Sequence, residues 1–85
     1  MISYDSDIFL KKLGERIVVL RKAQGKSQRD LAFDINWEKE NLRKIENGRT
    51  NPTTKTLLKI CSALEITMTE LFDFEINTNN DLSTE

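Results

Sequence analysis

The sequence contains no histidine, a single cysteine and a single proline among its 85 residues. The lone Cys61 cannot form an internal disulfide, and without histidine the common zinc-binding patterns are missing. The lack of histidine also removes the commonest general base near neutral pH, and no GxGxxG or GxxxxGK loop is available to hold phosphate groups. We therefore expect no enzyme active site, no metal and no cofactor.

Long apolar runs are missing as well. The longest uninterrupted aliphatic run, residues 17–20, is far shorter than the roughly 20 residues that a transmembrane helix requires. The N-terminal segment carries Asp5 and Asp7 where a secretory signal would carry positive charge. Hydrophobic residues make up 38% of the chain and charged residues 32%. This composition predicts one small soluble domain in the cytoplasm, with no membrane contact.

The net charge of −1 conceals an asymmetry along the chain. Residues 11–49 contain eleven Lys or Arg and six Asp or Glu, whereas residues 50–85 contain two and six. Binding to a phosphate backbone favours such a basic N-terminal part, although an ordinary solvated helix surface gives the same pattern. The charge distribution therefore keeps nucleic acid open as a partner.

The spacing of apolar residues, together with capping residues, predicts an all-α fold of five helices. The first three are expected at residues 7–24, 28–35 and 39–47, the fourth after Thr53 and the fifth after Thr67. Gly25 is expected to end the first helix in a left-handed conformation, and Ser27 to cap the second. We expect one compact domain over residues 7–74 and a polar tail over residues 75–85.

Residues 27–48, SQRDLAFDINWEKENLRKIENG, place two of these helices close together. Their spacing resembles a helix-turn-helix motif numbered from Gln28, in which a small residue such as Ala32 lets the two helices approach each other. Asn36 stands where the motif usually has glycine, and asparagine is the other residue that best tolerates a left-handed turn. The remaining motif positions are apolar: Leu31, Ile35, Trp37, Leu42 and Ile45.

The similarity extends beyond the motif, through LGERIVVLRKAQGKSQRDLA, LRKIENGRTNPTTKTLLKICSAL and TMTELF. Together these segments resemble the Cro and phage-repressor-like, or Xre, family of DNA-binding domains over residues 10–73. The resemblance implies a five-helix lambda-repressor-like domain in a sequence-specific transcriptional regulator. Such regulators usually bind an inverted repeat in double-stranded DNA as homodimers.

The resemblance also assigns roles to individual residues, because such domains place the third helix in the DNA major groove. Its exposed positions would face base edges: Lys39, Glu40, Arg43 and Lys44. Positions in and around the motif would contact the DNA backbone: Ser27, Gln28, Asn41, Asn47 and Arg49. An ion pair between Arg21 and Glu46 would join the first helix to the end of the third.

Two residues of this region allow more than one interpretation. Glu40 can accept a hydrogen bond from cytosine N4 or form salt bridges with Arg43 and Lys44, and we favour the salt bridges. Trp37 can lie partly exposed beside DNA, but its spacing from Leu42 is that of a hydrophobic staple, which favours core packing.

The predicted fifth helix is the candidate dimer interface, because a short C-terminal helix leaves apolar groups with few neighbours within the chain. The candidate residues are Met68, Leu71, Phe72 and Phe74. Within the DNA-binding class, a restriction-modification controller, a small phage or mobile-element repressor and an antitoxin all remain open. The alternative from another class is a protein-interaction module that uses the same fold to bind a partner such as a toxin.

Overall fold

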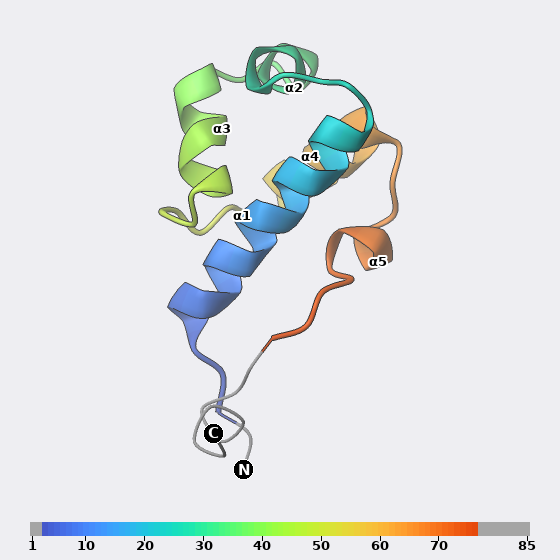
Figure 1. Cartoon of the computed structure of the whole chain (residues 1–85). Helices are drawn as coiled ribbons and strands as arrows, with labels where there is room; N and C mark the ends of the chain where they lie inside the picture. Colours follow the sequence, from blue (N-terminus) through green and yellow to red (C-terminus); the bar gives the residue numbers. More distant parts are fainter. Residues whose placement is uncertain (1–2, 77–85) are drawn as a thin grey trace.

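The computed structural model describes residues 3–76, and this part of the chain forms five α-helices. They are α1 (Ser6–Ala23), α2 (Gln28–Asp34), α3 (Lys39–Glu46), α4 (Thr54–Leu64) and α5 (Met68–Leu71). The long helix α1 crosses the molecule diagonally between α3 and α5, and contacts both (Figure 1). Helix α2 contacts α3 and α4, and α4 contacts α5. The predicted all-α class and the order of the helices are confirmed.

Capping side chains begin four of the helices. A carboxylate oxygen of Asp5 accepts hydrogen bonds from two amides of the first turn of α1, so this helix begins one residue earlier than the sequence pattern predicts. The predicted caps Ser27, Thr53 and Thr67 are confirmed, each accepting from the amide three residues on. Helix α3 follows Glu38, whose side chain makes no capping bond.

The core gathers apolar residues from all five helices. The five fully apolar motif positions other than Trp37 are at most 5% exposed: Leu31, Ala32, Ile35, Leu42 and Ile45. Trp37 is half-buried and packs against this core, as its spacing predicts. Cys61 is also a core residue, and burial raises the pKa of its thiol. The periodicity of the sequence therefore identifies the core correctly.

Two backbone positions fix how the helices meet. Asn36 has a φ of 57° in the turn between α2 and α3, which confirms the predicted left-handed conformation. Gly14 is buried in α1 against the end of α3, where an added Cβ would lie 2.4 Å from the carbonyl oxygen of Glu46. Real Cβ atoms essentially never approach another atom this closely, so only glycine allows the two helix backbones to touch here.

The expected dimer surface needs a correction. Leu71 is fully buried and belongs to the core, so it is not available to a second copy of the chain. Phe72 and Phe74 are half-buried because they pack with Phe9 of α1, at ring-centroid distances of 5.9 Å and 5.6 Å. Met68 has its sulfur 3.4 Å from that of Cys61. The apolar residues around α5 thus have more neighbours within the chain than the sequence argument assumed.

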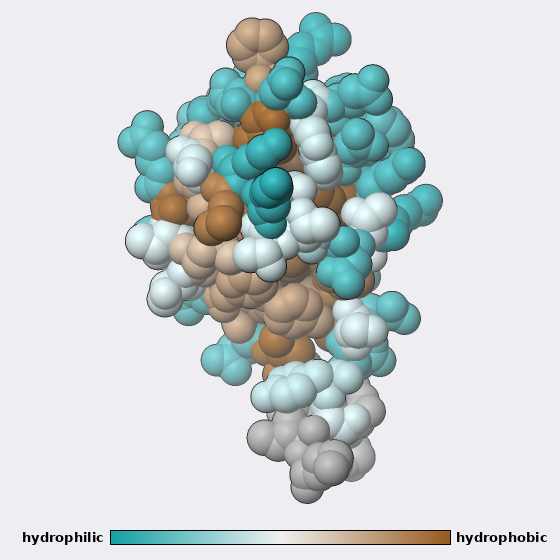
Figure 2. Space-filling model, turned by 180° about the vertical axis from the view of Figure 1, so that it is seen from behind, coloured by the Kyte–Doolittle hydropathy of each residue, from teal (hydrophilic) through white to brown (hydrophobic). Residues whose placement is uncertain are grey.

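Apolar side chains also reach the surface. Seen from behind, they gather over the middle of the molecule, with hydrophilic side chains around its upper part (Figure 2). The large exposed apolar residues include Val19, Phe33 and Leu58, which are 57%, 83% and 50% exposed. None of the helices in residues 3–76 is long and apolar enough to cross a membrane. Of the predicted tail, all but residues 75 and 76 lies outside the described residues.

Replacing Gly14 with alanine tests the contact between α1 and α3. We expect the Gly14→Ala variant to lose about 2 kcal/mol or more of unfolding free energy, because backbone atoms cannot yield to the new methyl group as a side chain would. Urea unfolding, followed by the fluorescence of Trp37, measures this loss. Lys11→Ala, at an exposed position of the same helix, is the control and should change stability by less than about 0.5 kcal/mol. Equal stabilities of the two variants would contradict the close contact.

Candidate nucleic-acid interface

The turn between α2 and α3 holds the two helices at a fixed angle. The amide of Trp37 donates to the carbonyl of Ala32 at 2.8 Å, and the amide of Asn36 donates to that of Phe33 at 3.1 Å. Leu42 and Ile45 anchor α3 in the core, so the opposite side of this helix faces outward. The exposed residues are Lys39, Glu40, Asn41, Arg43, Lys44 and Asn47.

A hollow of about 310 Å³ runs along this exposed side of α3. Five of its six lining residues are ones that the sequence selected for contact with DNA: Glu40, Arg43, Lys44, Asn47 and Arg49. The sixth is Thr50, which the sequence argument missed. Thr50 also lines a second hollow of about 340 Å³, which it shares with Trp37 and Asn41. Its position directly after Arg49, in the loop following α3, is the sequence signal that could have identified it.

Arg43 forms the one ion pair on the exposed side of α3 within residues 3–76. Its Nη1 lies 3.1 Å from Oε2 of Glu40, with the two side chains 56% and 61% exposed. Lys44 forms no ion pair in the described part of the chain, although it lies one turn beyond Glu40. The favoured interpretation of Glu40 as a salt-bridge partner is therefore confirmed for Arg43 and not for Lys44. The cations Lys39, Lys44 and Arg49 are left to attract an external anion.

A buried ion pair connects α1 to α3, as the family resemblance implies. Nε and Nη2 of Arg21 donate to the two carboxylate oxygens of Glu46 at 2.7 Å and 3.0 Å, and Nη1 donates to the carbonyl of Lys26 at 2.9 Å. Arg21 is 6% and Glu46 5% exposed. This two-pronged geometry fixes the rotation of α3 about its own axis.

Gln28 also reaches Glu46, a contact that the sequence argument did not foresee. Its Nε2 donates to Oε1 of Glu46 at 2.7 Å, which draws the side chain inward from the start of α2. Nε2 of Gln28 carries a second hydrogen that this bond does not use. The main-chain amides in the first turn of α2 have no hydrogen-bond acceptor within the helix. An anion at this end of α2 can therefore still be bound by Gln28.

Ser27 acts as a helix cap beside this position. Its hydroxyl oxygen accepts from the amide of Asp30 at 3.0 Å, and its own amide donates to the carboxylate of Asp30 at 3.0 Å. Hydrogen bonding to its carboxylate by the amide of Ser27, and then by the Ser27 side chain, lowers the pKa of Asp30.

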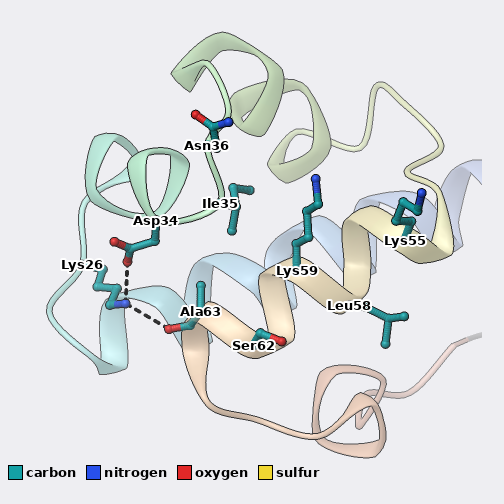
Figure 3. A pocket seen from close by; sticks show the side chains of 9 residues that line it. All are labelled: Lys26, Asp34, Ile35, Asn36, Lys55, Leu58, Lys59, Ser62 and Ala63. Carbon is teal, nitrogen blue, oxygen red and sulfur yellow. Dashed lines mark hydrogen bonds and ion pairs between the residues drawn. The ribbon is translucent and has the colours of Figure 1, made fainter.

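A wider hollow, of about 750 Å³, lies elsewhere, between α4 and the end of α2 (Figure 3). At one end of it, Nζ of Lys26 donates hydrogen bonds to the carboxylate of Asp34 at 2.7 Å and to the carbonyl of Ala63 at 3.0 Å. These bonds tie the first helix of the motif to α4. Within residues 3–76 no group of three His, Cys, Asp or Glu side chains could hold a metal ion. The predicted DNA-contact residues of α3 and its following loop lie outside this hollow.

Removing one partner of the buried ion pair should destabilise the protein strongly. In Arg21→Met, the carboxylate of Glu46 stays buried with Gln28 as its remaining partner, and we expect a loss of about 3 to 5 kcal/mol. Arg21→Met combined with Glu46→Leu should lose less, because no charge is left buried. Arg43→Met, which breaks the exposed pair, is the control and should cost under about 1 kcal/mol. Thermal unfolding, followed by circular dichroism, ranks the stabilities of the three variants. An Arg21→Met variant as stable as Arg43→Met would show that the buried pair is not needed for stability.

The comparisons with known proteins agree with this geometry. The helix-turn-helix family model matches residues 19–71. The HTH-type transcriptional regulator SlrR of Bacillus subtilis is 42% identical over 64 residues, which are 74% of this chain and 42% of that relative. The chain thus spans less than half the length of this curated relative.

Two solved structures of restriction-modification controllers share the fold. C.AhdI from Aeromonas hydrophila has a TM-score of 0.73 and 38% identity, covering 75% of this chain and 97% of its own. The C.Esp1396I tetramer, in complex with its natural 35 base-pair operator, has a TM-score of 0.69 and 31% identity, covering 75% and 84%. With the family model matched across α2, α3 and α4, the chain belongs to the helix-turn-helix family.

Proposed function

We propose that this protein is a transcriptional regulator that binds a specific sequence in double-stranded DNA. The observation that carries the proposal is the exposed side of α3, where Arg43, Lys44 and Arg49 line one hollow together with Asn47. In helix-turn-helix proteins the second helix of the motif enters the major groove, so this side of α3 would meet the base edges. Acting on DNA, the protein would be located in the cytoplasm.

The contacts divide into two groups on this proposal. Lys39, Arg43 and Lys44 would donate to base edges, since Arg and Lys are the usual partners of guanine O6 and N7. Backbone phosphates would be bound from both ends of the motif by Ser27, Gln28, Asn41, Asn47 and Arg49. The hydrogen bond from Gln28 to Glu46 joins the start of α2 to the end of α3. The base-reading and phosphate-binding residues would therefore contact the same duplex together.

The relatives support a role in transcription and suggest a narrower one. SlrR is named a transcriptional regulator, and the C.Esp1396I controller is bound to its operator. A restriction-modification controller is the second candidate, because C.AhdI is matched over 97% of its length and so needs no further domain beyond this fold. No described feature favours the antitoxin or the protein-interaction module over these two.

We also propose that the protein binds its operator as a homodimer, with recognition helices about 34 Å apart. Val19, which is 57% exposed, and Phe74 line one hollow of about 260 Å³ between α1 and the segment after α5. Together with the exposed parts of Met68 and Phe72, they form the proposed dimer surface. Leu71 supports this surface from within the core.

Selection of bound sites from a random DNA library tests the proposed function. We expect the protein to enrich an inverted repeat, and Arg43→Ala with Lys44→Ala to abolish the enrichment, because two base-reading cations are removed. Lys11→Ala with Lys22→Ala, which removes the same charge from exposed positions of α1, should retain it. No enrichment by the unmodified protein at low salt would overturn the proposal.

Analytical ultracentrifugation tests the dimer separately. We expect the protein to sediment at twice its chain mass of 9.9 kDa at micromolar concentration, and Val19→Asp with Phe74→Ser to sediment as a monomer. Charge placed in an apolar interface must be desolvated, which weakens association. Leu58→Asp, at an exposed apolar position of α4, should remain a dimer. A monomeric unmodified protein at high micromolar concentration would contradict the dimer.

A further inference from the structure

Glu40 occupies the middle of the surface that α3 presents. Leu42 and Ile45 point into the core, and with about 3.6 residues per turn the positions directly opposite them are those of Glu40 and Asn47. Arg43 and Lys44 lie on either side of this line. The residue aimed most directly away from the core is thus acidic, on a surface whose other charged groups are cations.

Stability gives this acidic residue only a small role, through its negative charge in the first turn of α3 and its pair with Arg43. The pair between Glu40 and Arg43 is more than half exposed on both sides, and exposed pairs of this kind contribute little to folding. An unpartnered carboxylate in a DNA groove would also be repelled by the phosphates. If Glu40 lies in the groove, a specific hydrogen bond to a base must offset this electrostatic repulsion.

The pair offers hydrogen-bonding groups in a defined order. Arg43 uses Nη1 on Oε2 of Glu40 at 3.1 Å, which leaves it further N–H donors in a fixed plane. Oε1 of Glu40 accepts no bond within residues 3–76. Side by side, the two groups present donors from the guanidinium and then an acceptor from the carboxylate.

This order is complementary to one base pair. In the major groove a G·C pair presents two acceptors, guanine N7 and O6, followed by a donor, cytosine N4. We propose that Glu40 and Arg43 together read one G·C pair in each half of the operator, an inference that rests on the proposed function. Arg43 donates to guanine N7 and O6, while Glu40 accepts from N4 of the paired cytosine and holds the guanidinium in plane.

The other three base pairs each break at least one of these bonds. An A·T pair turns a donor toward Arg43 and an acceptor toward Glu40, and a C·G pair does the same. A T·A pair keeps one acceptor and one donor but replaces guanine N7 by a methyl group, so Arg43 loses a bond. Glu40 and Arg43 therefore both reject A·T and C·G, whereas T·A is rejected by Arg43 alone.

Single-group changes in the DNA test the assignment. In the site recovered by library selection, the cytosine of each G·C pair in a half-site is replaced in turn by pyrimidin-2-one, which lacks the N4 amine. At one pair we expect the unmodified protein to bind about tenfold more weakly, as for loss of one base contact. The Glu40→Ala variant should bind the two DNAs within about twofold of each other, because its acceptor is already missing.

Two further measurements separate this role from a general charge effect. Asp7→Asn removes one negative charge from the exposed start of α1 and should keep the tenfold loss. Replacing guanine by 7-deazaguanine at the same pair removes N7 and should weaken binding by the unmodified protein and not by Arg43→Ala. Circular dichroism checks that each variant is folded.

The possible failures are distinguishable. If no site is enriched, the proposed function itself is wrong. If a site is enriched but contains no G·C pair that responds to the loss of N4, only the inference is wrong. Equal losses for Glu40→Ala and the unmodified protein would likewise overturn the inference and leave the proposed function standing.

Discussion

The carboxylate of Glu46 is the group on which the arrangement of the first three helices depends. It accepts three hydrogen bonds, two from Arg21 and one from Gln28, although it lies at the end of α3 and is 5% exposed. A buried charge is tolerated only when it is paired and fully bonded. The ends of α1 and α3 and the start of α2 must therefore meet at one point, and Gly14 lets the backbones of α1 and α3 come close enough for this.

This constraint connects packing to the proposed recognition of DNA. Gln28 stands at the start of α2, where a phosphate would bind, and its amide is held by the same carboxylate that orients α3. A phosphate bound there and a base read by α3 are thus placed relative to each other by buried bonds and not by flexible side chains. For a chain of this size, whose core is small, such bonds define the orientation of α3 more sharply than apolar packing alone.

Much of the fold could be predicted because its signals are local. Ser27 and Thr67 cap helices through atoms only three residues away, and Asn36 needs only its own φ. Contacts between distant residues were a different matter. The pair of Arg21 with Glu46 followed from the family resemblance and not from periodicity, and the bond from Gln28 to Glu46 was not foreseen. No spacing rule reports which side chain of one helix points at another helix.

The candidate dimer surface shows the same limit. A short helix with Leu71 and Phe72 reads as an unpartnered apolar face, yet Leu71 is fully buried and Phe72 stacks on Phe9, more than 60 residues earlier in the chain. Only the path of α1 past α5 brings these rings together. The pattern identified the residues as apolar, and the tertiary fold determined which neighbours they have.

The net charge of this protein predicts repulsion of DNA, whereas the charges exposed around α3 predict attraction. The chain carries −1 in total, but α3 and the loop that follows expose four cations, Lys39, Arg43, Lys44 and Arg49, of which only Arg43 is paired within residues 3–76. An anion near α3 experiences the local field, since charges more than about 8 to 10 Å away are largely screened at physiological salt. On the proposed function, DNA would therefore be attracted by the exposed cations of α3 and the following loop in spite of the negative net charge, and the specific contacts of α3 would contribute more to binding than the net charge does.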